Sequence, residues 1–169
     1  RHGATQALGI KEGEEVIVNP ITFNATSIVI LKEGAKPVYA DIDPKTYNID
    51  PKQIESKITP RTKAIYVVHY GGQMCDMDPI MAIAKKHNLF VLEDCAHAHG
   101  ATYKGKQAGS IGDIGCFSFH SLKNMVTLCE GGMITTNNDA LVDRIQRMRV
   151  MSITHWASDQ TVWEFGGHR

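Results

Sequence analysis

The chain has 169 residues, enough for one domain with a sizeable core, and its 43% hydrophobic and 21% charged residues are typical of a globular protein. Its 18 basic and 18 acidic residues cancel, which argues against a protein that binds nucleic acid or a membrane surface through a general basic field. No apolar run approaches the roughly 20 residues of a membrane span. The four cysteines form no C-x-x-C pair, so we expect reduced thiols in a cytoplasmic protein.

Short apolar segments alternate with segments of helical periodicity. The predicted order is a strand at 16–18, a helix at 23–32 closed by Gly34, a strand at 37–40, a helix started by Asp50-Pro51, a strand at 64–68, a helix started by Asp78-Pro79, strands at 89–92, 114–119 and 132–135, and a last helix capped by Asn138. This alternation predicts an α/β domain with a largely parallel sheet. Ligands of such sheets bind beyond the carboxyl ends of the strands, here the loops after residues 92 and 119.

Three motifs suggest chemistry that their details do not support. Residues 100–107 nearly match a phosphate-binding loop, but Gln107 replaces the hydroxyl that binds magnesium, and a turn between strands is the better interpretation. The glycines at 109, 112 and 115 do not have the spacing of a dinucleotide site. Cys95, His97 and His99 alternate along the chain, yet their spacing matches no established zinc pattern, so no metal site is predicted.

A second group of residues suits pyridoxal phosphate. Asp94 follows a buried predicted strand, and a carboxylate there could keep the pyridine nitrogen of the cofactor protonated. Ser118 lies at the end of another predicted strand, where a hydroxyl could hold the phosphate. Lys123 lies in the polar turn that follows, where an amine could form a Schiff base with the aldehyde. Each residue alone could be an ordinary turn or surface residue, and their combination favours a cofactor site.

The motifs around these residues resemble the DegT/DnrJ/EryC1/StrS family, the pyridoxal-phosphate sugar aminotransferases of fold type I. The resemblance rests on EDCAHAHGA at 93–101, GDIGCFSFH at 112–120, KN at 123–124 and EGG at 130–132, and on GEEVIV at 13–18, TF at 22–23, DIDP at 41–44, TPRTKAI at 59–65 and HYGG at 69–72. It implies a three-layer α/β sandwich with a mostly parallel sheet, resembling the large domain of these enzymes. Residues 1–169 are then expected to be an incomplete large domain, without an N-terminal segment and the small C-terminal domain.

The resemblance also implies a role for each candidate residue. Lys123 matches the Schiff-base lysine, and Asp94 matches the partner of the pyridinium nitrogen. His97 matches a residue that contacts the ring near its phenolic oxygen, and Ser118 matches a ligand of the phosphate. Phe23 matches an aromatic side chain that stacks on the ring, although a core aromatic at the start of a helix is an equally good interpretation from the residues alone.

The implied reaction transfers an amino group from glutamate or glutamine to a keto-sugar, often nucleotide-linked, or to a keto-cyclitol. The implied assembly is a homodimer with a shared active site. Because some members of the family are dehydratases with histidine at the lysine position, Lys123 favours transamination. A dehydratase or aromatising enzyme of the same family, a non-catalytic domain and, more distantly, a phosphate-binding NTPase remain as alternatives.

Overall fold

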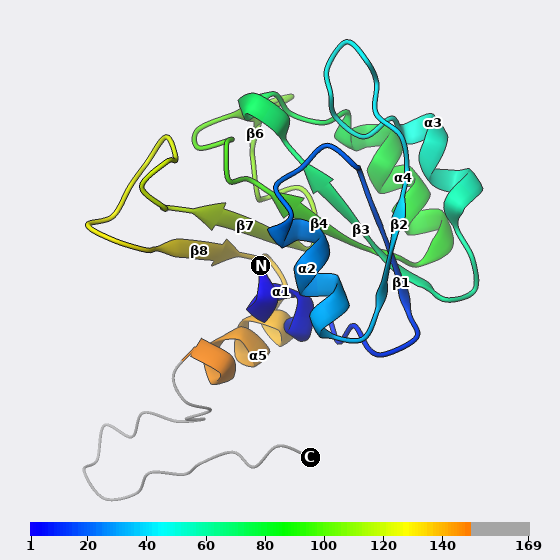
Figure 1. The fold of residues 1–169 in the computed structure, drawn as a ribbon, viewed down its shortest axis with the longest axis horizontal. Coiled ribbons are helices and arrows are strands. Elements are labelled where there is room, and N and C mark those ends of the chain that lie inside the picture. The colour runs from blue at the N-terminus through cyan, green and yellow to red at the C-terminus, as the bar shows by residue number, and fades with distance from the viewer. Residues whose placement is uncertain (150–169) are drawn as a thin grey trace, which may run out of the picture.

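Six strands form one sheet in the computed structural model, which describes residues 1–149 (Figure 1). They are β1 (Glu15–Val18), β2 (Lys36–Tyr39), β3 (Thr62–Val68), β4 (Phe90–Asp94), β7 (Ile114–Ser118) and β8 (Gly132–Thr135). Their spatial order is β2-β1-β3-β4-β7-β8, and every neighbouring pair is parallel except β7 and β8. The carboxyl ends of β3, β4 and β7 therefore lie at the same edge of the sheet.

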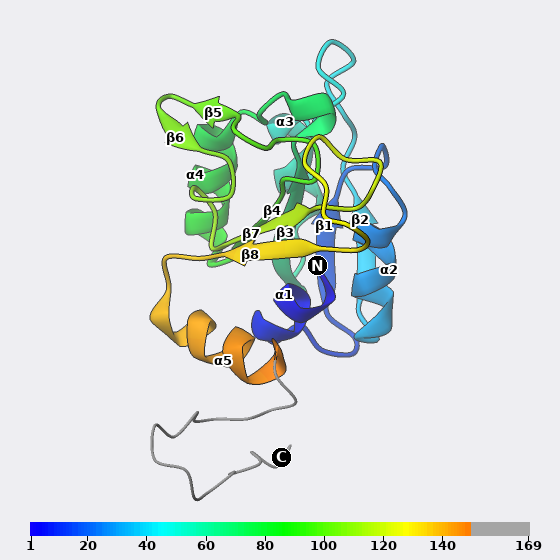
Figure 2. The same ribbon diagram turned by 90° about the vertical axis from the view of Figure 1, so that its left-hand side faces the viewer.

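Helices cover both faces of this sheet (Figure 2). One face packs against α1 (His2–Ala7), α2 (Ala25–Lys32) and α5 (Asp139–Arg149), and the other against α3 (Pro51–Ile54) and α4 (Met77–His87). The predicted three-layer α/β sandwich is thus confirmed. Among residues 1–149, no helix combines the length and apolar character needed to cross a membrane.

The side chains of the central strands alternate between the two layers of core. Val16 and Val18 pack in the core that contains α1, α2 and α5, whereas Ile17 between them packs in the core that contains α3 and α4. Successive side chains of a strand point to opposite faces of the sheet, so in β4 Leu92 packs in the first of these cores and Val91 in the second. It follows that the next two residues, at 93 and 94, point to opposite faces of the sheet.

Most predicted elements are confirmed, although several of their boundaries differ from the prediction. The first predicted helix starts at Ala25, two residues later than Phe23. The predicted strand at 114–119 ends at Ser118. The helix α4 starts at Met77 with Asp76 as its N-cap, so Asp78 lies in the first turn instead of capping it.

A contact from a distant part of the chain explains the start of α4. The hydroxyl of Tyr103 donates to Asp76 Oδ1 at 2.6 Å and accepts the amide N–H of Asp78 at 3.3 Å. The hydroxyl thereby gives the Asp78 amide a hydrogen-bond partner that the helix cannot supply. Pro79, which has no amide hydrogen, is tolerated in the first turn because amides there have no acceptor within the helix. Tyr103 belongs to the hairpin of β5 (Thr102–Tyr103) and β6 (Lys106–Gln107), which confirms a turn between strands in place of a phosphate-binding loop.

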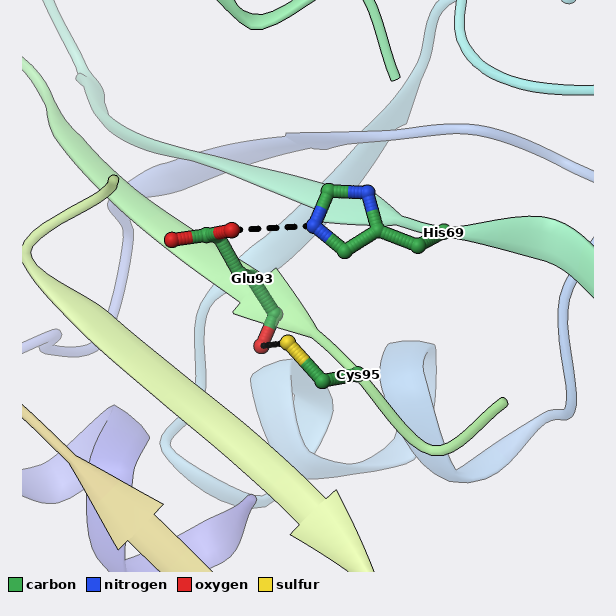
Figure 3. Close-up of side chains that lie close together, drawn as sticks. All are labelled: His69, Glu93 and Cys95. Atoms are coloured by element: carbon green, nitrogen blue, oxygen red, sulfur yellow. Dashed lines mark hydrogen bonds and ion pairs between the residues drawn. The ribbon is translucent and has the colours of Figure 1, made fainter. Parts of the chain in front are cut away.

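A buried carboxylate connects three segments at the carboxyl edge of the sheet (Figure 3). Glu93 accepts hydrogen bonds from His69 Nε2 at 2.9 Å and from the amides of Gly109, Ile111 and Gly112 at 3.0, 2.8 and 2.6 Å. Burial by itself would raise the pKa of Glu93, but the hydrogen bonds from His69, Gly112 and Gly109 outweigh it and leave that pKa below the ordinary 4.5. The carboxylate thus holds the end of β3 and the segment that enters β7 against β4.

Close backbone contacts within this segment require glycine. A Cβ atom on Gly112 would lie 2.7 Å from the carbonyl oxygen of Val91. A Cβ atom on Gly115 would lie 2.5 Å from Gly109 Cα and 2.6 Å from the Gly109 carbonyl oxygen. The spacing of these glycines therefore serves the packing of the backbone beside β4.

We expect Gly115→Ala to lower the free energy of unfolding by about 3 kcal/mol, because the added methyl group overlaps backbone atoms that cannot move aside. Urea denaturation followed by circular dichroism would measure this change. Gly3→Ala is the control, since the nearest atom to a Cβ there is Ile134 Cδ1 at 3.9 Å and alanine favours a helix by about 0.5–1 kcal/mol over glycine. Equal stability of Gly115→Ala and the parent protein would contradict the overlap.

We expect Glu93→Gln to lower the free energy of unfolding at pH 7 by about 3 kcal/mol, because the amide of glutamine would place hydrogens against hydrogen-bond donors. Since the folded-state pKa of Glu93 lies below 4.5, its contribution is complete above pH 4.5 and is lost as the pH falls. The difference between the two proteins in urea denaturation should therefore shrink in acid. In the control Glu12→Gln, at an exposed site, the change should stay within about 0.5 kcal/mol at both pH values.

Candidate functional site

A small pocket lies at the carboxyl edge of the sheet, where the loops after β3, β4 and β7 meet. Its lining includes Arg1, Phe23, Tyr70, Asp94, His97 and Lys123. An adjoining pocket is lined by Arg1 and Ser118 together with His2, Gly131 and Gly132. The structure thus brings four of the five predicted site residues to one pocket and the fifth to its neighbour, with Arg1 on the border of both.

Asp94 is the most buried of the predicted site residues, with 1% of its surface exposed. Its Oδ1 atom accepts from the Arg1 guanidinium at 2.7 Å and from the Ala96 amide at 3.2 Å, and its Oδ2 atom accepts from the Thr26 hydroxyl at 3.1 Å. The Thr26 hydroxyl in turn lies 2.9 Å from that of Thr22. A buried carboxylate in these surroundings is oriented rigidly and has a cation as its partner.

Lys123 and His97 reach the same point from two different loops. Lys123 lies in the turn after β7, where its amide donates to the His120 carbonyl at 2.9 Å, and His97 lies in the turn after β4. The Lys123 amine nitrogen is 3.1 Å from His97 Nε2. Burial and, next, the charge of Lys123 lower the pKa of His97 below 6.5, which favours the uncharged imidazole.

The other two candidates flank this pair. Phe23 lies just before α2, and 69% of its surface is exposed although it lines the pocket. It therefore does not belong to the core, and the interpretation as a core aromatic was wrong. Ser118 is the last residue of β7, and its hydroxyl oxygen accepts the His120 amide at 3.4 Å.

Two neighbours of Asp94 and one turn were missed by the sequence reasoning. Arg1 and Thr26 contact Asp94 across 93 and 68 residues of chain, and no local pattern marks such contacts. The turn at Tyr70–Gly72 contacts His97 and was noticed only as part of a family motif. The segment from Trp156 to Trp163, considered as a substrate loop, lies outside the described residues.

Metal-binding residue types gather elsewhere in the described part of the chain, at His69, Glu93 and Cys95 (Figure 3). Their acceptor atoms are already used. His69 Nδ1 accepts the Cys75 amide at 3.1 Å, and the Glu93 carboxylate has the four donors described above. Burial also raises the pKa of the Cys95 thiol, which opposes the thiolate that a metal requires.

The three alternating residues after β4 have separate surroundings in the structure. Cys95 belongs to the His69–Glu93–Cys95 group, and His97 lines the pocket. His99 packs against the rings of Phe117 and Phe119, with both centroid distances at 5.6 Å.

The chain is similar to known proteins over most of its length. It is 54% identical over 144 residues to the dTDP-3-amino-3,6-dideoxy-alpha-D-galactopyranose transaminase of Aneurinibacillus thermoaerophilus, which covers 85% of this chain and 40% of that protein. The structure of an aminotransferase from Psychrobacter cryohalolentis superposes with a TM-score of 0.91 at 47% identity, over 99% of this chain and 42% of that one. NtdA from Bacillus subtilis with bound cofactor PMP gives a TM-score of 0.85 at 36% identity, over 98% and 37% of the two chains.

These proteins are more than twice as long as the present chain, which spans about 40% of the transaminase. The five predicted site residues, Phe23, Asp94, His97, Ser118 and Lys123, all lie between residues 2 and 168. The model of the DegT/DnrJ/EryC1/StrS aminotransferase family matches residues 2–168. Together with the fold and the placement of the five site residues, this match shows that the chain belongs to the DegT/DnrJ/EryC1/StrS aminotransferase family.

Proposed function

We propose that this chain is part of the large domain of a pyridoxal-phosphate-dependent aminotransferase that transfers an amino group from glutamate or glutamine to a keto-sugar, often nucleotide-linked, or to a keto-cyclitol. The observation that carries the proposal is the meeting of Asp94, Lys123, His97 and Phe23 at one pocket. The relative named as a transaminase of a dTDP-sugar supports a nucleotide-linked sugar, and the PMP-bound neighbour supports the cofactor.

The residues present fit this cofactor. Asp94 is buried and has a guanidinium at 2.7 Å, so its surroundings already accommodate a positive charge such as a protonated ring nitrogen. Lys123 offers an amine at the border of the pocket, and Phe23 offers an exposed ring beside it. Pyridoxal phosphate, when bound, supplies a ring that withdraws electrons from the carbon bearing the amino group.

The five site residues would then have distinct roles around the bound cofactor. Asp94 would keep the proton on the ring nitrogen, and Ser118 would donate its hydroxyl hydrogen to the phosphate. Phe23 would lie against one face of the ring and exclude water from it. Lys123 would hold the cofactor at rest and, once released, would take a proton from the substrate carbon and deliver it to C4′ of the cofactor. His97 would contact the ring near its phenolic oxygen, and its Nε2 lies 3.1 Å from the Lys123 amine.

We further propose that the complete protein is a homodimer with a shared active site. The loop between β7 and β8, which carries Lys123, projects beyond the strands (Figure 1, yellow). It exposes several apolar side chains, in particular Leu122, with 85% of its surface exposed, and Leu128, which is fully exposed. A second copy that covered this loop would remove these side chains from water next to the reacting lysine.

Unpaired thiols support a cytoplasmic location. Cys75, Cys95 and Cys116 are free and buried, and Cys129 is free and exposed. Burial raises the pKa of Cys75 to about 12 and that of Cys116 to about 11, so these thiols stay protonated and unreactive. Free cysteines persist in a reducing compartment.

In the full-length protein, borohydride treatment in the presence of pyridoxal phosphate should attach the cofactor to Lys123, as peptide mass spectrometry would show. Lys123→Ala should lower the rate of amine transfer by about 10²–10⁴-fold, because the proton at the substrate carbon loses its acceptor. Lys106→Ala, an exposed lysine on β6, is the control and should leave the rate unchanged. Full transfer activity in Lys123→Ala would refute the assignment.

Asp94→Asn should retain part of the cofactor binding and lose about 10²–10³-fold in the rate of amine transfer, since the neutral amide no longer stabilises a positive ring nitrogen.

Product analysis with a keto-sugar separates transamination from the dehydratase reaction. Gain of an amine supports transamination, whereas loss of water without gain of an amine would indicate the dehydratase reaction instead.

Leu128→Asp should convert the full-length protein from dimer to monomer, because a charge would replace an apolar contact at the proposed interface. Sedimentation velocity would measure the change in mass, and the rate of amine transfer should fall with it. Phe90→Asp is the matched control, since Phe90 is also exposed but begins β4 at the opposite edge of the sheet. A parent protein that sediments as a monomer would contradict the shared site.

A further inference from the structure

The turn after β3, at Tyr70–Gly72, makes a specific contact with His97. The amide N–H of Gly71 donates to His97 Nδ1 at 3.3 Å. A neutral imidazole carries one hydrogen, so a nitrogen that accepts a hydrogen bond leaves that hydrogen on the other nitrogen. An acceptor role for Nδ1 places the proton of His97 on Nε2, 3.1 Å from the Lys123 amine, and it requires that amine to be uncharged so that its lone pair can accept.

The turn is held in place by contacts that do not involve any ligand. The Tyr70 amide donates to Asn48 Oδ1 at 2.9 Å, and the Gly72 amide donates to the His69 carbonyl at 3.1 Å. His69 is itself held by Glu93, as described above. The contact between Gly71 and His97 is thus anchored to the interior of the protein.

The backbone of the turn also lies close against the segment that carries His97. Gly72 has a φ of +88°, and a Cβ atom there would lie 2.9 Å from the His97 carbonyl oxygen. Gly71 has a φ of +60°, yet a Cβ atom on it would meet nothing within 4 Å. The positive φ favours glycine at both positions, but only at Gly72 would a side chain also collide with the segment that carries His97.

The charge state of His97 agrees with this geometry. Burial is the main cause that lowers its pKa below 6.5, and this effect does not depend on the charge of Lys123. The opposing effect of Asp94 is smaller than that of burial. An uncharged ring is the form in which Nδ1 can accept from Gly71.

We propose that the Tyr70–Gly72 turn fixes His97 in the tautomer with its proton on Nε2, so that His97 acts in the pocket only as a hydrogen-bond donor. It can donate to the lone pair of an uncharged Lys123 amine or to an anionic oxygen of a bound cofactor, and it cannot take a proton at that atom. The part that concerns the reaction rests on the proposed function, and it assigns proton abstraction to Lys123 alone. The Gly71 amide acts through His97 and is a positioning group.

Nitrogen-15 NMR of the full-length protein with labelled histidines tests the tautomer, with and without pyridoxal phosphate. The signals of His97 are identified by their absence from His97→Gln. In the parent protein we expect a protonated Nε2 and an unprotonated Nδ1, and we expect this state to persist below pH 6.5. A protonated Nδ1 at neutral pH would overturn the proposal.

Two glycine variants test whether the turn sets the tautomer. Gly72→Ala should displace the turn and give His97 a mixture of tautomers. Gly71→Ala keeps the amide donor and adds a methyl group in open space. The φ of +60° costs alanine about 1 kcal/mol, but a folded Gly71→Ala protein should give the His97 signals of the parent protein. Parental signals in a folded Gly72→Ala protein would show that the turn is not required and would overturn the proposal.

Kinetics test the role of donor. His97→Gln can place an N–H group near the position of Nε2, whereas the side chain of His97→Asn is too short to do so. We expect the asparagine variant to transfer amine about 10-fold more slowly than the glutamine variant. Equal rates would contradict a donor at Nε2. Because the NMR signals do not depend on turnover, failure of Lys123 to carry the cofactor would refute the proposed function and leave the tautomer measurement intact.

Discussion

The hydrogen bonds of the Glu93 carboxylate are the interaction on which the rest of the site depends. A carboxylate that is fully removed from water needs a partner for each lone pair, and Glu93 obtains them from His69 and from three amides at Gly109–Gly112. One of these partners ends β3 and the others lead into β7. The loops that carry His97 and Lys123 therefore start from segments whose relative positions are set inside the protein, before any ligand binds.

Two adjacent carboxylates on β4 have different surroundings because a strand alternates its side chains between two faces. Glu93 points to the face that includes α4, and hydrogen bonds from His69 and the backbone stabilise its charged carboxylate. Asp94 points to the face that includes α1 and α2, where Arg1 and Thr26 are its partners. The same pair of acidic residues thus supplies a structural anchor on one side of the sheet and a charged group for the pocket on the other.

The two other polar residues of the pocket, His97 and Lys123, lie in loops that differ in how firmly the rest of the protein holds them. His97 is held from two sides, by the Gly71 amide and by the edge of the Tyr70 ring at a centroid distance of 6.1 Å. Lys123 lies in a loop whose apolar side chains face outward. A rigid histidine opposite a lysine on an exposed loop suits the proposed reaction, in which the Lys123 amine would first hold the cofactor and would then release it.

Local patterns by themselves predicted the strands, the α/β class and the candidates Asp94, Ser118 and Lys123, because periodicity and strand ends are visible in short stretches of chain. His97 and Phe23 became candidates only through the resemblance to the family. The contacts that give those residues their properties came only from the tertiary structure. Tyr103 decides where α4 begins, β8 turns antiparallel at the edge of the sheet, and Arg1 reaches Asp94 across 93 residues. The proton position on His97 depends on Gly71, 26 residues away. A hydrogen bond between distant segments leaves no local pattern, because its partners become neighbours only when the sheet has formed.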